Sequence, residues 1–266
     1  MPSAGRVRYL EALPPPAERA RGVLLLLHAF PLNARMWEPQ LVMAARGWHV
    51  IAPQVRGVDG GTEDQPAASI DEHAADIIDL LDALHIEDVV VGGLSMGGYT
   101  AFALLRHAPS YVRGLVLADT KSEADTPDAI EGRTRMLGIV EKSGAAGVAD
   151  DMIPKLLGET TRRDRPAIVE RVRHLALANS PESIAGAIRA LMSRPDSTPQ
   201  LASIHVPTLI IVGEEDTVTP PRAAEAMHAR IAGSQLVRIP QSGHLSSLEQ
   251  PDAFNDALAA FLDHRV

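Results

Sequence analysis

The chain contains no cysteine among its 266 residues. This absence excludes disulfide bonds, a thiolate nucleophile, and zinc or iron–sulfur sites with cysteine ligands. Catalytic chemistry must therefore come from serine, histidine, aspartate and glutamate. Aromatic residues are also few: two Trp, three Tyr and four Phe. We expect no stacking site for a large aromatic cofactor, and we predict neither a cofactor nor a metal.

Long apolar runs are missing as well. The longest clean one, residues 23–27, is far too short to cross a bilayer, so we expect no membrane partner. The first eight residues, MPSAGRVR, carry charges without a following apolar segment. This pattern predicts a cytoplasmic protein without a signal peptide.

Positive charge is scarce: 25 Lys and Arg stand against 34 Asp and Glu, a net charge of −9. Binding to nucleic acid needs clustered cations, so we expect no nucleic-acid partner. The imbalance is uneven along the chain. Residues 121–200 contain 12 charges of each sign, which leaves 13 basic and 22 acidic residues elsewhere. A neutral, charge-dense segment inside an acidic chain indicates an inserted module.

Short aliphatic runs alternate with helical spacing at both ends of the chain. Strands are predicted at residues 6–13, 23–27, 50–52, 89–91, 115–117, 208–212 and 236–239, and helices at 34–45, 70–85, 96–107, 219–231 and 248–262. This alternation predicts an α/β fold with a mostly parallel, twisted sheet and helices on both faces.

The middle of the chain differs, because residues 121–202 have helical spacing throughout. We expect this segment to be a helical lid between two parts of one core, residues 1–120 and 203–266. Residues 54–66 are predicted to form a loop. Two pairs of residues mark helix starts: Ser69 with Glu72 as a capping box, and Thr219 with Pro220 as an N-cap and first helical position.

Ser95 lies where a predicted strand meets a predicted helix, inside Gly93-Leu94-Ser95-Met96-Gly97. A serine on a sharp strand-to-helix turn has strained dihedral angles, and the residues two positions away need to lack side chains so that the backbones can pass. Gly93 and Gly97 meet that demand. The helix start favours a developing oxyanion, for which the N–H of Met96 would be one donor. The motif predicts Ser95 as a nucleophile.

A serine nucleophile needs a histidine base, and the base needs a carboxylate that holds its tautomer. On a parallel sheet these groups belong on loops just past strand ends. Of the ten histidines, His28 and His244 occupy such positions, and His244 follows the serine in the chain order that this kind of triad requires. His244 is the predicted base. His28 is expected to hold the next loop, whose Phe30 N–H would be the second oxyanion donor.

The choice of the acid stays open on the residues alone. Glu214, Glu215 and Asp216 follow the penultimate predicted strand, and by position any of the three could orient His244. Asp119, which follows an earlier strand, is the alternative acid. Its other reading is a capping or turn carboxylate, the commoner role of such a residue.

With these residues identified, the chain resembles the α/β-hydrolase family over residues 23–119 and 207–262. Four stretches carry the resemblance: HAFP at His28, GLSMG at Gly93, GEEDTVTP at Gly213 and SGHLSSLEQP at Ser242. Within the family the chain is similar to the group of 3-oxoadipate enol-lactonases, small-ester esterases and cofactor-free haloperoxidase-like enzymes. The resemblance implies the α/β-hydrolase fold with an inserted helical lid.

The resemblance also implies roles for particular residues. It assigns Ser95 as the nucleophile, His244 as the base, Asp216 as the acid that orients it, and Phe30 and Met96 as oxyanion donors. An aspartate nucleophile at the elbow characterises the dehalogenase branch, so the serine disfavours that branch.

Two positions depart from the family's pattern. Ala29 stands where many relatives have glycine, which adds a Cβ to the oxyanion loop. Gln54 replaces the aspartate of the usual D-x-R-G loop, whereas Arg56 and Gly57 are kept. We interpret that loop as structural support, so the lost charge is expected to affect stability more than chemistry.

Together the residues and the resemblance predict a hydrolase that cleaves small carboxylic esters or lactones through an acyl-enzyme. We expect His28, Trp37, Met136 and Leu137 in the substrate pocket. Two alternatives stay open: a cofactor-free perhydrolase or haloperoxidase-like activity with the same triad, and a ligand receptor with this fold and low turnover.

Overall fold

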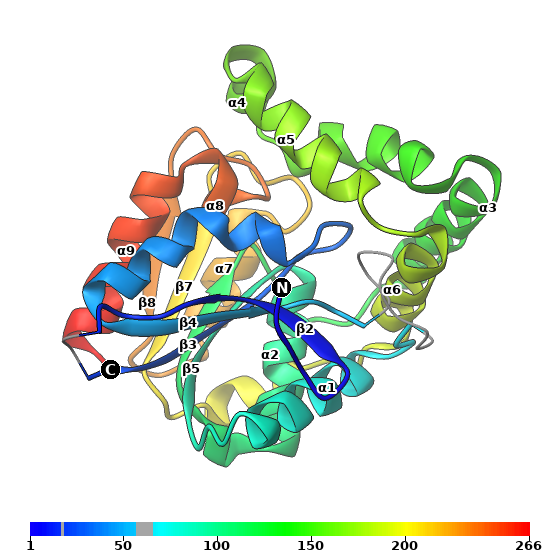
Figure 1. Ribbon diagram of the computed structural model, residues 1–266. Coiled ribbons are helices and arrows are strands. Elements are labelled where there is room, and N and C mark those ends of the chain that lie inside the picture. The colour runs from blue at the N-terminus through cyan, green and yellow to red at the C-terminus, as the bar shows by residue number, and fades with distance from the viewer. Residues whose placement is uncertain (17–18, 57–65) are drawn as a thin grey trace.

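Figure 1 shows the computed structural model, which describes residues 1–16, 19–56 and 66–266. Most of the loop predicted at residues 54–66 lies outside the described residues. Within them an eight-stranded sheet has the order β1-β2-β4-β3-β5-β6-β7-β8. The strands are Ser3–Ala4 (β1), Val7–Ala12 (β2), Gly22–Leu27 (β3), Trp48–Pro53 (β4), Val89–Leu94 (β5), Val112–Ala118 (β6), Thr208–Gly213 (β7) and Gln235–Ile239 (β8).

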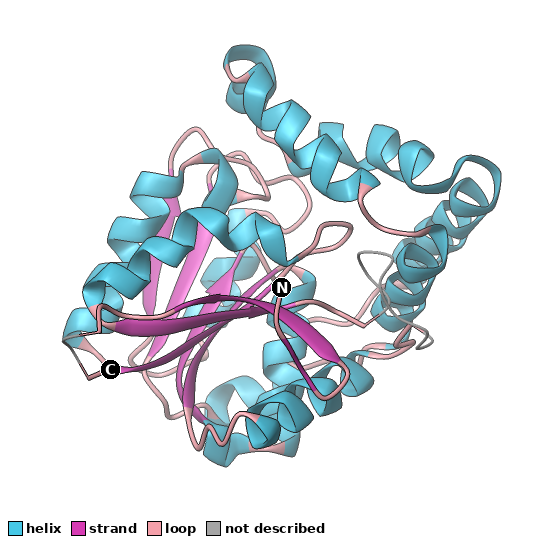
Figure 2. Cartoon of the chain, viewed as in Figure 1, coloured by secondary structure: helices cyan, strands magenta, loops and turns pink. Residues whose placement is uncertain are grey.

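The sheet is parallel from β4 to β8, and only the β1–β2 and β2–β4 pairs of the described strands are antiparallel. Helices η1 (Ala34–Arg46) and α9 (Pro251–His264) pack on one face, while α1 (Ile70–Ala83), α2 (Met96–His107) and α7 (Pro221–His228) pack on the other. Figure 2 shows this arrangement, with the magenta strands between cyan helices. The predicted α/β-hydrolase fold with a mostly parallel sheet is confirmed.

Alternation along the central strands explains why both faces are covered. In β3, Leu24 and Leu26 belong to the apolar cluster with η1 and α9, whereas Leu25 and Leu27 belong to the cluster with α1 and α2. Successive side chains of a strand point to opposite faces, so an all-apolar strand needs helices on both sides.

Residues 121–202, which we call the helical insertion, connect β6 to its parallel neighbour β7. Its helices are α3 (Pro127–Leu156), α4 (Glu159–Asp164), α5 (Pro166–Leu177), α6 (Pro181–Ser193) and the 3-10 helix η4 (Thr198–Ser203). In Figure 1, α3 to α6 stand apart from the two covered faces of the sheet. Helix α3 is broken at Gly144, where φ is 57°. None of the helices in the described ranges is both long and apolar enough to span a bilayer.

The helix starts agree only in part with the predicted ones. The hydroxyl of Ser69 accepts a hydrogen bond from the Glu72 N–H at 3.1 Å, so Ser69 is confirmed as the N-cap, but the Glu72 carboxylate accepts the N–H of Ala68 where the predicted capping box has that of Ser69. The prediction that Thr219 caps a helix is wrong. Helix α7 begins at Pro221, because the Thr219 hydroxyl donates to the carboxylate of Asp216 instead.

Three further helices differ from their predictions. The segment predicted as a helix at residues 34–45 is the 3-10 helix η1, which contains Pro39. Helix α7 ends at His228, before the predicted residue 231. The last helix is two helices, α8 (Ser246–Glu249) and α9, because proline at position 251 lacks the N–H that would continue the first one.

Truncation of a fully buried aromatic ring tests the packing between the sheet and α2. Phe102 is fully buried in the cluster with α1 and α2. We expect Phe102→Ala to lower the free energy of unfolding by about 3–5 kcal/mol, because the ring leaves a cavity. Equilibrium urea unfolding measures the effect. Val42→Ala, at a side chain that is 49% exposed, is the control; an equal effect of both substitutions would contradict this packing.

Candidate active site

Ser95 lies on the turn between β5 and α2 and has φ 55° and ψ −112°. Non-glycine residues adopt positive φ uncommonly, so this backbone is strained. A Cβ on Gly93 would overlap the carbonyl of Gly97, and a Cβ on Gly97 would overlap the carbonyl oxygen of Leu27. Both glycines of the motif are therefore required by backbone groups that approach closely.

His244 follows β8 and bridges the two other predicted members of the triad. Its Nε2 lies 2.7 Å from Ser95 Oγ, and its Nδ1 lies 2.8 Å from Asp216 Oδ2. The imidazole is buried, and the acidic partner on Nδ1 fixes the tautomer that carries its proton there. Nε2 is then an acceptor for the serine hydroxyl, which is the arrangement that a general base needs.

Asp216 is held in place by the loop that follows it. Its Oδ1 accepts the N–H groups of Val218 at 2.8 Å and Thr219 at 2.9 Å. The Thr219 hydroxyl donates to Oδ2 at 2.7 Å. These bonds satisfy a carboxylate that is almost entirely buried and aim its second oxygen at His244.

The interactions between Asp216 and His244 shift the pKa of each group in the direction opposite to the effect of burial. Burial by itself would raise the pKa of Asp216, but attraction to His244 and their hydrogen bond bring that pKa below its ordinary value. Burial would likewise lower the pKa of His244, yet the charge and hydrogen bond of Asp216 raise it above its ordinary value. The protonated form of the His244 imidazole is thus stabilised by this carboxylate.

Asp119, the alternative acid, has different partners. Its Oδ1 accepts the Gly213 N–H at 2.9 Å, and its Oδ2 accepts the Ser246 N–H at 3.0 Å and the Ser246 hydroxyl. Burial, reinforced by the charge of Asp216, raises the pKa of Asp119 to about 7. This carboxyl group joins the ends of β6 and β7 to the start of α8, and no hydrogen bond links it to the imidazole of His244 in the part of the chain described.

One of the two predicted oxyanion donors starts the helix that follows the serine, and the other is on a loop. Met96 is the first residue of α2, and Phe30 is a buried residue on the loop after β3. Neither backbone N–H donates to an acceptor among residues 1–16, 19–56 and 66–266. Ala29, the departure from the glycine of relatives, is fully buried in the main apolar cluster, so the core accommodates its Cβ.

His28 holds the loop that carries Phe30 by two hydrogen bonds. Its Nδ1 donates to the Ala29 carbonyl at 3.1 Å, and its Nε2 accepts the Val55 N–H at 3.1 Å. Burial lowers the pKa of His28 to about 4, so the ring is neutral at neutral pH. Gln54 supports the same region, since its side-chain oxygen accepts the Ala34 N–H at 2.8 Å.

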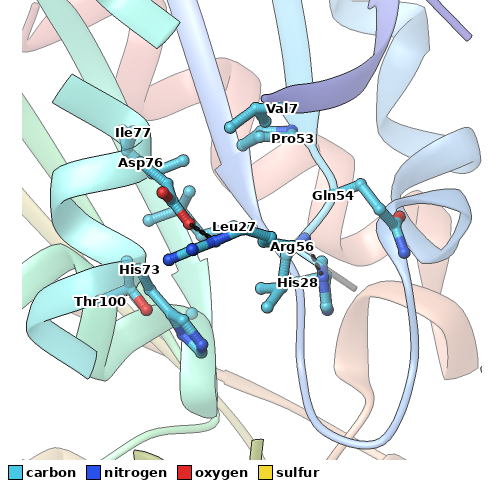
Figure 3. A pocket seen from close by; sticks show the side chains of 12 residues that line it. Val7, Leu27, His28, Pro53, Gln54, Arg56, His73, Asp76, Ile77 and Thr100 are labelled. Atoms are coloured by element: carbon cyan, nitrogen blue, oxygen red, sulfur yellow. Dashed lines mark hydrogen bonds and ion pairs between the residues drawn. The ribbon is translucent and has the colours of Figure 1, made fainter. Parts of the chain in front are cut away.

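Figure 3 shows a pocket behind this loop, lined by His28, Gln54 and Arg56 on one side and by His73 and Thr100 on the helices opposite. His73 is buried, although its helical sequence position gave no sign of this. Burial lowers the pKa of His73 to about 3. Neither histidine of this pocket is charged near neutral pH, and His244 alone of these three contacts Ser95.

The four residues predicted to line the substrate pocket lie in different parts of the structure. His28 lines a second pocket with the loop residue Phe30 and with Met96, whose other wall is Ile184 and its neighbours on α6. Met136 lines a groove between α3 and the loop after Asp216.

The other two predicted pocket residues lie elsewhere. Leu137 is partly buried against the main apolar cluster. Trp37 lines neither of these two pockets: its ring is buried in the core, with its centroid 6.0 Å from that of Phe254 on α9, and its place in the substrate pocket stays a prediction. Helix η1 directs this side chain toward α9, which the spacing of residues along η1 did not reveal.

Comparison with known proteins identifies the family to which the chain belongs. The sequence pattern of the alpha/beta hydrolase family matches residues 24–257. The chain belongs to the alpha/beta hydrolase family. The 3-oxoadipate enol-lactonase 2 of Acinetobacter baylyi is 29% identical to this alpha/beta hydrolase over 242 residues, which are 91% of this chain and 89% of the relative.

Solved structures agree with this assignment. A thermophilic esterase from Thermogutta terrifontis is 36% identical and superposes with a TM-score of 0.90 over 97% of this chain and 93% of its own. The enol-lactonase from Burkholderia xenovorans LB400, at 23% identity, shares the fold with a TM-score of 0.87 over 97% and 96% of the two chains. The resemblance to this group of hydrolases, inferred from four sequence stretches, is confirmed.

Two residues of the site were missed by sequence reasoning. Thr219 was interpreted as a helix cap, yet it donates to Asp216. Glu249 lies in the SGHLSSLEQP stretch, and its carboxylate accepts the N–H groups on both sides of His244, from Gly243 and Leu245. Neither role leaves a signal in the sequence beyond the place of Thr219 in GEEDTVTP and of Glu249 in SGHLSSLEQP.

Exchange of each aspartate for asparagine separates the two acids. We expect Asp216→Asn to lower kcat by about four orders of magnitude, because the imidazole loses the partner that fixes its tautomer. Asp119→Asn should mainly reduce stability, by about 1–3 kcal/mol, because a buried donor is left unsatisfied. Steady-state ester hydrolysis and thermal unfolding measure the two effects. The opposite pattern would transfer the role to Asp119.

Proposed function

We propose that this alpha/beta hydrolase cleaves small carboxylic esters or lactones by a serine mechanism with an acyl-enzyme intermediate. The observation that carries the proposal is the imidazole of His244, with Ser95 Oγ 2.7 Å from one nitrogen and Asp216 Oδ2 2.8 Å from the other. The esterase and enol-lactonase among its relatives support the ester and lactone classes of substrate.

The first half-reaction forms a covalent bond. Ser95 Oγ attacks the carbonyl carbon while its proton passes to Nε2 of His244. The N–H groups of Phe30 and Met96 bind the oxyanion of the tetrahedral intermediate. His244 then gives the proton to the departing oxygen, which leaves as an alcohol or, for a lactone, as the hydroxyl end of the same molecule.

The second half-reaction restores the serine. A water molecule gives a proton to His244 Nε2 and attacks the acyl carbon, and the ester bond to Ser95 breaks as the proton returns to Oγ. Asp216 stays ionised throughout and stabilises the imidazolium in both steps. Neither step needs an oxidant, a reductant or a metal. The ester or lactone and one water molecule are the only reactants.

The pocket beside the oxyanion loop supports a modest acyl group. Its walls are the loop residues Phe30 and Leu32 on one side and Ile184 and Ala187 of α6 on the other. We infer that the helical insertion serves as a cap that completes this pocket, because α6 supplies one wall. These four side chains are apolar and favour a small aliphatic acyl group, while His28, Asn179 and Ser183 of the same pocket are polar.

Removal of the nucleophile tests the proposed mechanism. We expect Ser95→Ala to lower kcat for p-nitrophenyl acetate by about six orders of magnitude, because among the described residues no other hydroxyl lies on Nε2 of His244; the Thr219 hydroxyl is next to Nδ1. A fluorophosphonate label should attach to Ser95 in the wild type, as located by peptide mass, and not to the variant. Full activity of the variant would show that the serine is not the nucleophile.

The pH profile tests the state of the base. His244 acts as a base only when its Nε2 is unprotonated, and its pKa is raised above 6.5, chiefly by the charge of Asp216 acting against burial. We therefore expect kcat/KM to rise with pH through a midpoint above that of a free imidazole. Initial rates over a series of buffers at constant ionic strength measure it; a midpoint below the ordinary histidine value would contradict this assignment.

A further inference from the structure

Glu249, at the end of α8, is a fully buried carboxylate that the proposed mechanism does not use. No lysine or arginine in the described ranges forms an ion pair with it. A buried charge is costly unless hydrogen bonds satisfy it. The contacts of this carboxylate therefore indicate what keeps it in place.

Three backbone N–H groups meet at the carboxylate. Oε1 accepts the N–H of Gly243 at 2.9 Å and that of Leu245 at 3.1 Å, so one oxygen holds the residues on both sides of His244. Oε2 accepts the N–H of Gly158 at 2.8 Å, which belongs to the helical insertion. One side chain thus joins the loop of the catalytic base to the insertion.

The same stretch of the insertion has two more bonds to this region. The N–H of His244 donates to the carbonyl of Leu156 at 2.9 Å, and the N–H of Thr160 donates to Glu215 Oε2 at 2.9 Å. The backbones approach so closely that a Cβ on Gly243 would overlap the N–H of Gly158. The backbone of His244 is therefore held between Glu249 and residues 156–160.

We propose that Glu249 is a positioning residue for the catalytic base, and that residues 156–160 of the helical insertion belong to the same assembly. The carboxylate fixes the backbone on both sides of His244, so Nε2 stays on Ser95 and Nδ1 stays on Asp216. The proposal rests on the serine mechanism proposed above. It also implies that this end of the insertion stays attached to the core during turnover, because release would free the base.

The charge of Glu249 acts on the imidazole in addition to its hydrogen bonds. Burial lowers the pKa of His244, and the carboxylates that surround the ring from three elements outweigh it: Asp216 first, then Asp119 and Glu249. Arg165 donates to the carbonyl oxygen of Glu249 and so contacts its backbone instead of its carboxylate. Loss of this negative charge would destabilise the imidazolium, so the pKa of His244 would fall.

The test is Glu249→Gln in the full-length protein with p-nitrophenyl acetate. An amide cannot accept three N–H groups, because its NH₂ end faces at least one of them. We expect kcat to fall by about ten- to a hundredfold with KM little changed, since a small misplacement of a catalytic group has effects of this size. The acid limb of kcat/KM should shift to lower pH. Glu249→Asp keeps the charge and should keep the pH of that limb.

Glu215→Gln is the matched control, because it also removes a carboxylate that binds residues 156–160 but does not contact the loop of His244 through its side chain. We expect it to leave the pH profile unchanged. Near-UV circular dichroism and thermal unfolding establish that each variant is folded. If Glu249→Gln fails to fold, the shorter aspartate variant still carries the test, through a reduced kcat at an unchanged acid limb.

Each outcome bears on one claim. Wild-type kcat and pH profile in Glu249→Gln, with an inactive Ser95→Ala, would overturn the positioning role alone. Equal losses in Glu249→Gln and Glu215→Gln, without a pH shift, would assign the effect to a loosened insertion and also overturn it. Activity retained in Ser95→Ala would instead refute the serine mechanism itself.

Discussion

The imidazole of His244 has to hold two hydrogen bonds at once, one to a hydroxyl and one to a carboxylate, and the surrounding structure depends on this requirement. The three groups come from residues 95, 216 and 244, yet each lies just past the end of a strand. Parallel strands place all their carboxyl ends at one edge of the sheet, so β5, β7 and β8 deliver the three side chains to the same place. The fold thereby converts a long separation in sequence into contact distances of 2.7 and 2.8 Å.

Three buried carboxylates surround this imidazole, and their hydrogen bonds give each a different role. Asp216 accepts two N–H groups with one oxygen and presents the other to His244. Both carboxylate oxygens of Asp119 accept hydrogen bonds, one from Gly213 and the other from Ser246, and so this side chain joins the ends of β6 and β7 to α8. Glu249 accepts the backbone N–H groups of Gly158, Gly243 and Leu245. Since buried charges need partners, the available donors decide which carboxylate is free to bind the ring.

Glycine makes the close approaches around the site possible. The elbow requires Gly93 and Gly97, and the contact between the insertion and the histidine loop requires Gly158 and Gly243. At both places two backbones meet where a Cβ would overlap a neighbouring group. The second contact shows that the helical insertion is joined to the core at the loop of His244 as well as through its covalent connections to β6 and β7.

Much of this could be predicted from the sequence, because periodicity, glycine spacing and the order of motifs are local properties of the chain. The alternation of strands and helices determined the α/β fold, and G-x-S-x-G with a later histidine past a strand end determined the candidates Ser95 and His244. The tertiary structure alone decided that Asp216 contacts the ring, that Thr219 serves Asp216, that Trp37 enters the core and that Glu249 binds three N–H groups. These choices depend on which donors and cavities distant segments bring together, and a local pattern holds no information about such distances.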